Sequence, residues 1–320
     1  MTGVRAVSGT YQNPFPFPVA DPFMLTAPDG RYYLYGSSED GAFRARSSTN
    51  LIDWREEGEI YRAGPDGWCV DCLWAPECYH FEGRYYLFFS ANWRENPNSE
   101  AENFRIGVAV SDHPAGPFTD LLNRPIFDPG YPVIDASVHS EDGRYYLYYS
   151  HCCYKHRVGD LEESWIYGVE MEPDFSGVRG EPVLLLKPEQ PWEDRSIKST
   201  GRRWNEGSFL IKRGNHYYMT FSANFYAEGD YAVGYATADS PLGPFVKAAE
   251  NPILEKSGEV TGPGHGCAFQ TTGGAWFFVY HGYTTSFGGV RVGLMDPIRW
   301  DGGRMRILGP KLGLQLLAND

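Results

Sequence analysis

One short pattern recurs five times along the chain and limits what the chain can fold into. The copies are DGRYYLYGSS at 29–38, EGRYYLFFSA at 82–91, DGRYYLYYSH at 142–151, RGNHYYMTFSA at 213–223 and TGGAWFFVYHG at 272–282. In each copy a tight turn precedes a run of β-branched or aromatic residues, which is the pattern of a hairpin entering a strand. The chain is therefore expected to repeat one β-structured unit.

The spacing of the copies indicates the size of that unit. Their first aromatic residues lie 53 to 72 residues apart, which is close to the length of a four-stranded propeller blade with its loops. No window shows a sustained helical apolar pattern. The sequence predicts an all-β, five-bladed β-propeller that forms a single domain over 1–320, because each blade buries its faces against its neighbours. A β-sandwich whose strands merely look alike is the alternative.

Charge and hydropathy limit the partners and the location. The 28 Lys and Arg are outnumbered by 41 Asp and Glu, and the net charge of −13 would repel a nucleic acid. No stretch approaches the 18 or more consecutive apolar residues that span a membrane. Because the start MTGVRAVSGTYQNPF has no apolar run after a basic segment, we expect no signal peptide and a cytoplasmic protein.

The six cysteines carry little information about function. Cys69 and Cys72 form a C-x-x-C pair, which suggests a zinc or redox site. No second C-x-x-C and no paired histidines follow, and a domain of this size does not need disulfides for stability. Unpaired, half-buried thiols are the expected state.

The residues 10 or 11 positions before each first aromatic are the candidate site. They are Asp21, Trp74 with Ala75, Asp135, Glu206 and His265. In a propeller the first strand of each blade runs beside the central axis, so these side chains should converge. A buried charge without partners is costly, and unrelated blades have no structural reason to share acids at one register. The alternative for any single acid is that it caps a turn.

A cluster of carboxylates walled by aromatic rings suits the hydrolysis of a glycosidic bond. One carboxylic acid protonates the leaving oxygen, and another carboxylate activates water or attacks carbon. The two groups must have different pKa values. A negative charge on Asp135 would raise the pKa of Glu206. Asp21 precedes Pro22, so it is expected to be a rigid, ionised acceptor for a water.

Five short motifs carry a resemblance to a known family. VADPF, WAPE, VIDAS, NEGSF and GPGHG, one to a repeat, resemble the blade-leading motifs of glycoside hydrolase family 43 over residues 13–310. The resemblance implies a five-bladed propeller that hydrolyses α-L-arabinofuranosides or β-D-xylosides with inversion. It implies that Asp21 is the general base, Glu206 the general acid and Asp135 the third carboxylate, which orients the acid and raises its pKa.

The same resemblance implies further contacts with the sugar. Trp74 and Ala75 match positions that contact the sugar in the innermost subsite. His265 matches the histidine on the propeller axis, which in many members faces a bound calcium or a water cluster. Arg291 resembles the arginine that reaches the sugar ring, although Arg299 and Arg304 lie nearby in the sequence.

The predicted function is release of terminal α-L-arabinofuranosyl residues from arabinan or arabinoxylan oligosaccharides. The β-sandwich that follows the propeller in many xylosidases of the family is missing from these 320 residues, which disfavours the first alternative, an exo-β-1,4-xylosidase. A non-catalytic sugar-binding propeller is the second. A retaining fructan or sucrose hydrolase is suggested by Glu77-Cys78, but the Asn-Asp-Pro-Asn-Gly start of those enzymes is absent. The insertion at 186–205, with Trp192 and Trp204, could wall the pocket or form a surface loop.

Overall fold

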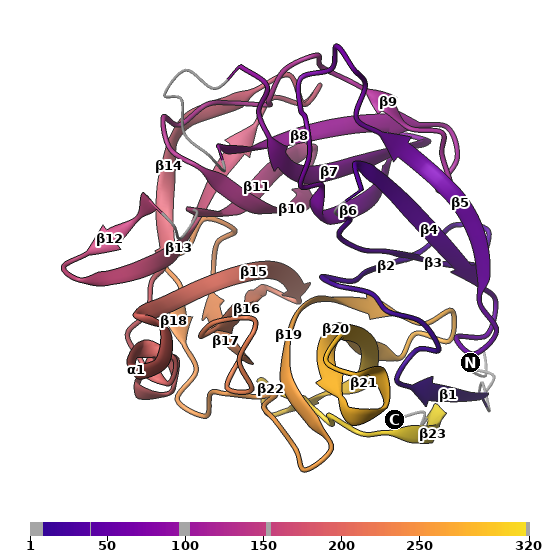
Figure 1. Ribbon diagram of the computed structural model, residues 1–320, viewed down its shortest axis with the longest axis vertical. Helices are drawn as coiled ribbons and strands as arrows, with labels where there is room; N and C mark the ends of the chain where they lie inside the picture. Colours follow the sequence, from indigo (N-terminus) through magenta and orange to yellow (C-terminus); the bar gives the residue numbers. More distant parts are fainter. Residues whose placement is uncertain (1–8, 39, 96–102, 152–154, 318–320) are drawn as a thin grey trace.

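The computed structural model describes residues 9–38, 40–95, 103–151 and 155–317, and nearly all of their regular structure is β-strand (Figure 1). The only α-helix of these ranges is the four-residue α1 (Ile197–Thr200). Two short 3-10 helices are also present, η2 (Pro191–Asp194) and η3 (Thr285–Phe287). The predicted all-β class is therefore confirmed.

Most strands form antiparallel sets of four. In chain order the sets are β2 (Phe23–Thr26), β3 (Tyr32–Tyr35), β4 (Ala42–Ser48) and β5 (Arg55–Arg62); β6 (Trp74–Phe81), β7 (Arg84–Asn92), β8 (Phe104–Ser111) and β9 (Thr119–Asp120); β10 (Val133–Glu141), β11 (Arg144–His151), β13 (Leu161–Met171) and β14 (Val178–Leu186); β15 (Arg202–Arg213), β16 (His216–Ala223), β17 (Ala232–Ala238) and β18 (Val246–Lys247); β19 (Val260–Gln270), β20 (Trp276–Thr284), β21 (Arg291–Asp301) and β22 (Arg304–Ile307). Each set contains one copy of the sequence repeat, which forms its second strand.

Three further strands connect parts of the chain that the repeats do not. β1 (Gly9–Asn13) pairs with β23 (Gly313–Leu317), so the two ends of the described chain lie together, as Figure 1 shows. β12 (Arg157–Val158) pairs with the start of β13. β13 also runs parallel to β15 over three residue pairs, which joins the third and fourth sets into one hydrogen-bonded sheet.

The first strand of each set lies nearest the centre of the molecule in Figure 1. Along this inner circle β2 contacts β6, β6 contacts β10, β10 contacts β15 and β15 contacts β19. β19 in turn contacts β2, so the last set meets the first. The residues at the inner ends of these strands are thereby brought together from segments far apart in the sequence.

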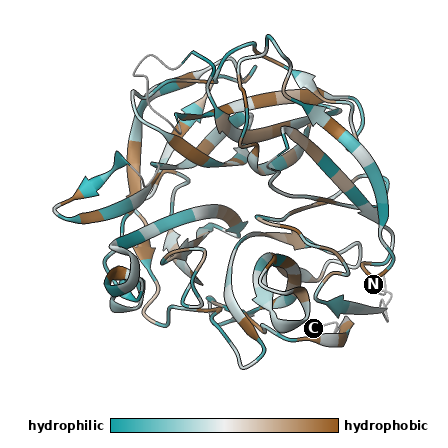
Figure 2. Ribbon diagram, in the orientation of Figure 1, coloured by the Kyte–Doolittle hydropathy of each residue, from teal (hydrophilic) through white to brown (hydrophobic). Residues whose placement is uncertain are grey.

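Apolar layers fill the space between neighbouring sets. Because both faces of a central strand are covered, β8 is buried along its whole length. Aromatic rings dominate these layers: Tyr61 and Phe89 lie 4.9 Å apart between the first two sets, and Tyr218 and Trp300 lie 4.6 Å apart between the last two. Figure 2 shows the outer strand β5 as mostly hydrophilic, which agrees with its largely exposed side chains. The single-domain boundary at 1–320 stays a prediction.

The structure bears on the predicted state of the cysteines and on the expected lack of a membrane span. Cys69, Cys78 and Cys267 are completely buried thiols rather than half-buried ones, because they lie inside the apolar layers, whereas Cys72 is half-buried. Cys152 and Cys153 lie outside the described residues. Within the described ranges, no helix has the length and apolarity that crossing a membrane requires. The cytoplasmic location stays a prediction.

Candidate active site

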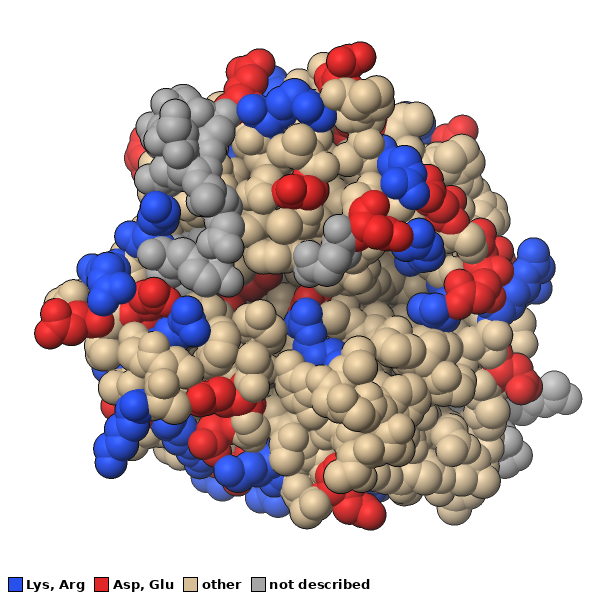
Figure 3. Space-filling view, viewed as in Figure 1, with Lys and Arg blue, Asp and Glu red and all other residues tan. Residues whose placement is uncertain are grey.

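The inner ends of the first strands surround a pocket that contains nearly all the predicted site residues. Asp21, Trp74, Asp135, Glu206, His265 and Arg291 line it together with Ile134, Trp204, Tyr226 and Tyr231. Ala75 is buried beside Trp74 and is not among the lining residues; its N–H donates to the Ser37 hydroxyl at 2.8 Å. In Figure 3 acidic and basic side chains meet in a hollow near the centre of this face. The residues at the shared register, Asp21, Trp74, Asp135, Glu206 and His265, thus lie around one pocket.

The backbone has an unusual conformation at the pocket. Asp21, Ala75, Asp135 and His265 have φ values of 50°, 45°, 61° and 43°, and Gly207, directly after Glu206, has 55°. A residue with a Cβ in this left-handed region costs of order 1–3 kcal/mol and persists only where its surroundings hold it. The pairing of β10 with β11 and of β15 with β16 shifts register just here. Such bulges re-aim side chains, and here they turn them toward the centre.

Asp21 is held as an ionised carboxylate. Its Oδ1 lies 2.9 Å from the Arg291 guanidinium, and the Ser37 hydroxyl donates to its Oδ2 at 2.5 Å. Nδ1 of His265 and Nδ1 of His281 lie 3.5 and 3.2 Å from Oδ1. Burial raises the pKa of Asp21, but the surrounding groups, above all the positive charge of Arg291, outweigh burial and hold the pKa well below its usual range. Asp21 is therefore ionised before the reaction and free to accept a proton from a water.

Glu206 has the opposite proton affinity. It is only 4% exposed, and burial raises its pKa well above the usual range, with a further increase from the charge of Asp135. The Tyr231 hydroxyl donates to Glu206 Oε1 at 2.8 Å, which lowers the pKa but does not reverse the shift. The site thus places a carboxyl that holds its proton more tightly than usual opposite one that loses its proton more readily, the pairing that acid and base work requires.

Asp135 supports Glu206 through the backbone. Its Oδ2 accepts hydrogen bonds from the Ser150 hydroxyl at 3.1 Å and from the Gly207 N–H at 3.0 Å. Burial raises the pKa of Asp135, while the charge of His265 and the Gly207 N–H lower it. The carboxylate therefore fixes the peptide directly after Glu206. A side chain at Gly207 would meet the His265 ring at 3.0 Å, which explains the glycine.

The remaining predicted residues have distinct places. Arg291 lies in the pocket with its guanidinium 5.1 Å from the centre of the Tyr226 ring, whereas Arg299 and Arg304 line other surface hollows. For the metal, the described ranges contain no group of three His, Cys, Asp or Glu residues at ligand spacing. His265 instead faces Asp21. The described side chains thus do not form a calcium or zinc site by themselves, and calcium at the axis stays a prediction.

Several residues of the pocket were missed by sequence reasoning. Tyr231 and Tyr226 lie between β16 and β17, outside every repeat, so no register could place them. His281 lies within the fifth repeat, and its position in the repeat could have identified it. It is the fifth residue after Trp276, where the other four repeats have serine at the same register.

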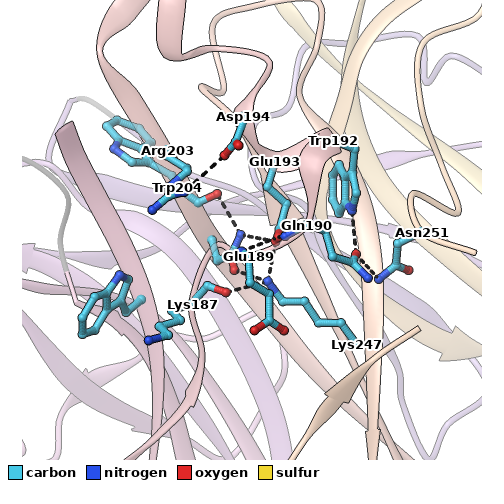
Figure 4. Close-up of polar contacts among 12 residues, drawn as sticks. Lys187, Glu189, Gln190, Trp192, Glu193, Asp194, Arg203, Trp204, Lys247 and Asn251 are labelled. Carbon is cyan, nitrogen blue, oxygen red and sulfur yellow. Dashed lines mark hydrogen bonds and ion pairs between the residues drawn. The ribbon is translucent and has the colours of Figure 1, made fainter. Parts of the chain in front are cut away.

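A buried ion pair between Lys247 and Glu193 contacts Asn205, the residue before Glu206 in the chain, and Figure 4 shows the pair. The Lys247 ammonium contacts a Glu193 carboxylate oxygen and donates to Asn205 Oδ1 and to the Lys187 carbonyl, both at 2.7 Å. Asn205 Nδ2 donates to the same Glu193 oxygen at 2.8 Å, and the other oxygen accepts backbone N–H groups of Glu189 and Gln190. All donors and acceptors of the pair are satisfied, so the network fixes the residue before Glu206.

The insertion at 186–205 contributes both to the pocket wall and to an apolar layer. Trp204 lines the pocket, as one of the two interpretations expected. Trp192 does not: it is 7% exposed and packs against Phe221 with ring centres 5.9 Å apart, as part of the apolar layer. The segment between them carries Glu193 of the buried ion pair.

Comparison with known proteins agrees with this geometry. The family model for glycosyl hydrolases family 43 matches residues 11–305. The chain belongs to this family. It is similar to a β-D-galactofuranosidase from Aspergillus niger, with 28% identity over 274 residues, covering 79% of this chain and 71% of the relative. An extracellular exo-α-(1→5)-L-arabinofuranosidase from Streptomyces chartreusis is 29% identical over 286 residues, covering 85% and 82%. The crystal structure of a thermostable family-43 glycoside hydrolase superposes with a TM-score of 0.86 at 35% identity, covering 95% of this chain and 97% of that one.

Membership of family 43 makes the chain a glycosidase and removes the alternative of a non-catalytic sugar-binding propeller. It also removes the retaining fructan hydrolase suggested by Glu77-Cys78. Glu77 is not among the pocket residues, and burial raises its pKa to about 8. Its hydrogen-bond partner is the Tyr79 hydroxyl, on the same strand β6. The Glu-Cys pair is thus part of an inner strand below the site.

Proposed function

We propose that this family 43 enzyme removes terminal α-L-arabinofuranosyl residues from arabinan or arabinoxylan oligosaccharides. The observation that carries the proposal is the pairing of a carboxyl with a lowered pKa, Asp21, with one whose pKa is raised, Glu206, in one pocket with aromatic walls. Rings such as those of Trp74, Trp204 and Tyr226 offer apolar faces to a sugar.

The roles follow from the contacts. Glu206 gives its proton to the departing glycosidic oxygen, while Asp21 takes a proton from the water that attacks the anomeric carbon. The charge of Asp135 adds to the effect of burial, which raises the pKa of Glu206, and Asp135 fixes the adjacent Gly207 peptide. Arg291 neutralises Asp21 and can reach a hydroxyl of the bound sugar from its half-buried position.

The choice of a furanoside rests on the relatives. Two proteins similar to this chain are named for the release of β-D-galactofuranose and α-L-arabinofuranose. These sugars share the configuration of their five-membered rings and differ in the length of the exocyclic chain, so one pocket shape serves both. A β-D-xyloside presents a six-membered ring instead, and exo-β-1,4-xylosidase activity is the alternative that the assay below distinguishes.

Two finer properties belong to the same proposal. The inner circle of β2, β6, β10, β15 and β19, in which each strand contacts the next, supports a closed five-bladed β-propeller with one blade for each set of four strands. Inversion of the anomeric configuration is proposed from the family resemblance. It fits a mechanism in which Asp21 activates a water rather than attacking the sugar.

The test is a comparison of p-nitrophenyl α-L-arabinofuranoside, p-nitrophenyl β-D-galactofuranoside and p-nitrophenyl β-D-xyloside at equal enzyme concentration. We expect the highest kcat/KM on the arabinofuranoside, and release of single arabinose units from arabino-oligosaccharides. Proton NMR of the first product formed should show the inverted anomer. A higher kcat/KM on the xyloside would replace the proposed substrate with the alternative.

A further inference from the structure

A position shared by all five repeats points to a residue that the reaction scheme does not yet contain. Counting five residues on from the first aromatic of each repeat gives Ser37, Ser90, Ser150, Ser222 and His281. In the structure each of them lies on the second strand of its set or within two residues of its end. The last four have at most 1% exposure, and Ser37 is half-buried.

The four serines share one task. Ser37 Oγ accepts the N–H of Ala75 at 2.8 Å, Ser90 Oγ accepts that of Asp135 at 2.9 Å, and Ser222 Oγ accepts that of His265 at 2.8 Å. Ser150 acts through a carboxylate: it donates to Asp135 Oδ2, which accepts the Gly207 N–H. Every acceptor holds a residue with positive φ on the first strand of the next set.

His281 does the same for Asp21, across the junction of the last set with the first. Its Nδ1 lies 3.2 Å from the backbone N of Asp21, with the N–H directed at it, and 3.2 Å from Oδ1 of the same residue. The ring is 0% exposed, and its Nε2 has no hydrogen-bond partner among the described residues. All polar contact of this buried imidazole is therefore with the residue that the proposed mechanism uses as its base.

We propose that His281 is a positioning residue for Asp21: the imidazole Nδ1 accepts the Asp21 N–H and holds the strained backbone that aims the carboxylate into the pocket. The inference rests on the proposed role of Asp21 as general base. The His281 contact completes a circle of five, in which each set of strands holds the backbone at or next to a pocket residue of the next set.

The electrostatic surroundings agree with a neutral imidazole in that role. Asp21 faces the ring from before β2, Arg291 from β21, His265 from β19 and Tyr231 from before β17. Burial, the largest effect, lowers the pKa of His281 to about 4, so the ring is neutral at pH 7. The Asp21 N–H directed at Nδ1 then assigns the lone pair to Nδ1 and the proton to Nε2. The Tyr231 ring is stacked on the imidazole with ring centres 5.8 Å apart, and the Tyr231 hydroxyl donates to Glu206. The residue that supports the acid therefore packs against the residue that supports the base.

Two substitutions separate the Nδ1 contact from the bulk of the ring. His281→Asn places an oxygen as many bonds from the backbone as Nδ1, whereas His281→Gln places it at the distance of Nε2, which contacts nothing polar. We expect the Asn variant to retain kcat within about fivefold of wild type. The Gln variant should lose about 10²-fold in kcat with KM changed less than threefold, the size of effect that a displacement of about 1 Å of a catalytic group produces.

The substrate dependence identifies which catalytic group has moved. A misplaced base slows every substrate, so the loss in His281→Gln should be equal on an oligosaccharide and on an activated aryl glycoside. A loss confined to the oligosaccharide would mean that the damage passes through Tyr231 to Glu206, and equal losses in the Asn and Gln variants would mean that bulk alone matters. Either result overturns the proposal.

A measurement on the unaltered protein keeps the test valid if the Gln variant does not fold. Nitrogen NMR of histidine-labelled enzyme at pH 7 should show His281 as the neutral tautomer with an unprotonated Nδ1, and a proton on Nδ1 would overturn the inference. Rates are compared on whichever glycoside the wild type cleaves. Failure of the furanoside proposal would appear in the wild type, and failure of this one in the variants and the tautomer.

Discussion

The substitution Asp135→Asn tests the electrostatic core of the site with little change of shape. The amide oxygen can still accept the Ser150 hydroxyl and the Gly207 N–H, so the backbone after Glu206 keeps its support. What is lost is one negative charge. Burial is the larger cause of the raised pKa of Glu206 and remains in the variant, while the charge of Asp135 is the second. We expect the pKa of Glu206 to fall by about one unit, equivalent to about 1.4 kcal/mol, and to stay above its usual value.

The assay is kcat/KM as a function of pH on an unactivated arabino-oligosaccharide, for which protonation of the leaving oxygen matters most. Activity requires protonated Glu206, so the high-pH limb of the profile should move to lower pH by about one unit. The low-pH limb should stay in place, because the pKa of Asp21 is lowered mainly by Arg291, which the variant retains. A high-pH limb that does not move would refute the assignment of Asp135 as the group that raises the pKa of Glu206.

Four further predictions concern single contacts. Asp21→Asn should lower kcat at least 10²-fold on every glycoside while circular dichroism shows an unchanged fold, and a loss under tenfold would remove Asp21 from the mechanism. Glu206→Ala should lower turnover of a disaccharide by about 10²–10⁴-fold and that of an aryl glycoside much less; equal losses would contradict its role as acid. Lys247→Met leaves the buried Glu193 charge unpaired and should lower the free energy of unfolding by about 3–5 kcal/mol in denaturant titrations, whereas the double variant Lys247→Met/Glu193→Gln should recover most of it; no recovery would argue against a paired charge. If calcium is bound at the axis, exhaustive chelation should lower activity and added calcium restore it, and an unchanged rate would exclude a functional metal.

Much of the fold could be predicted because it repeats. The repeated aromatic segments are the second strands of successive sets, and an offset of 10 or 11 residues from them leads to Asp21, Asp135, Glu206 and His265. The offset holds because strands advance by a constant length per residue and each set is built alike. Arg291 was the exception, since it was chosen by resemblance among several arginines and the structure places it beside Asp21.

Other features could not be predicted for identifiable reasons. The pairing of β1 with β23 and of β13 with β15 joins segments that carry no repeat. Tyr231 approaches Glu206 because Gly264 leaves room for its ring: a Cβ there would lie 2.3 Å from it, a fit between loops that no periodicity encodes. Nothing in the sequence paired Lys247 with Glu193 either, because the two residues are far apart and each alone resembles a surface charge.

The contacts that hold the sets of strands together are also the contacts that shape the pocket. Each pocket residue with positive φ stores strain, and a side chain of the preceding set offsets that strain by accepting its N–H directly or through Asp135. Loosening one junction between neighbouring sets therefore lets the backbone of a pocket residue relax from its positive φ before the sheet itself unfolds. Activity should consequently be lost at a lower denaturant concentration or temperature than the strand content. The junction of the last set with the first, where His281 holds Asp21, is the one with an imidazole in place of a hydroxyl.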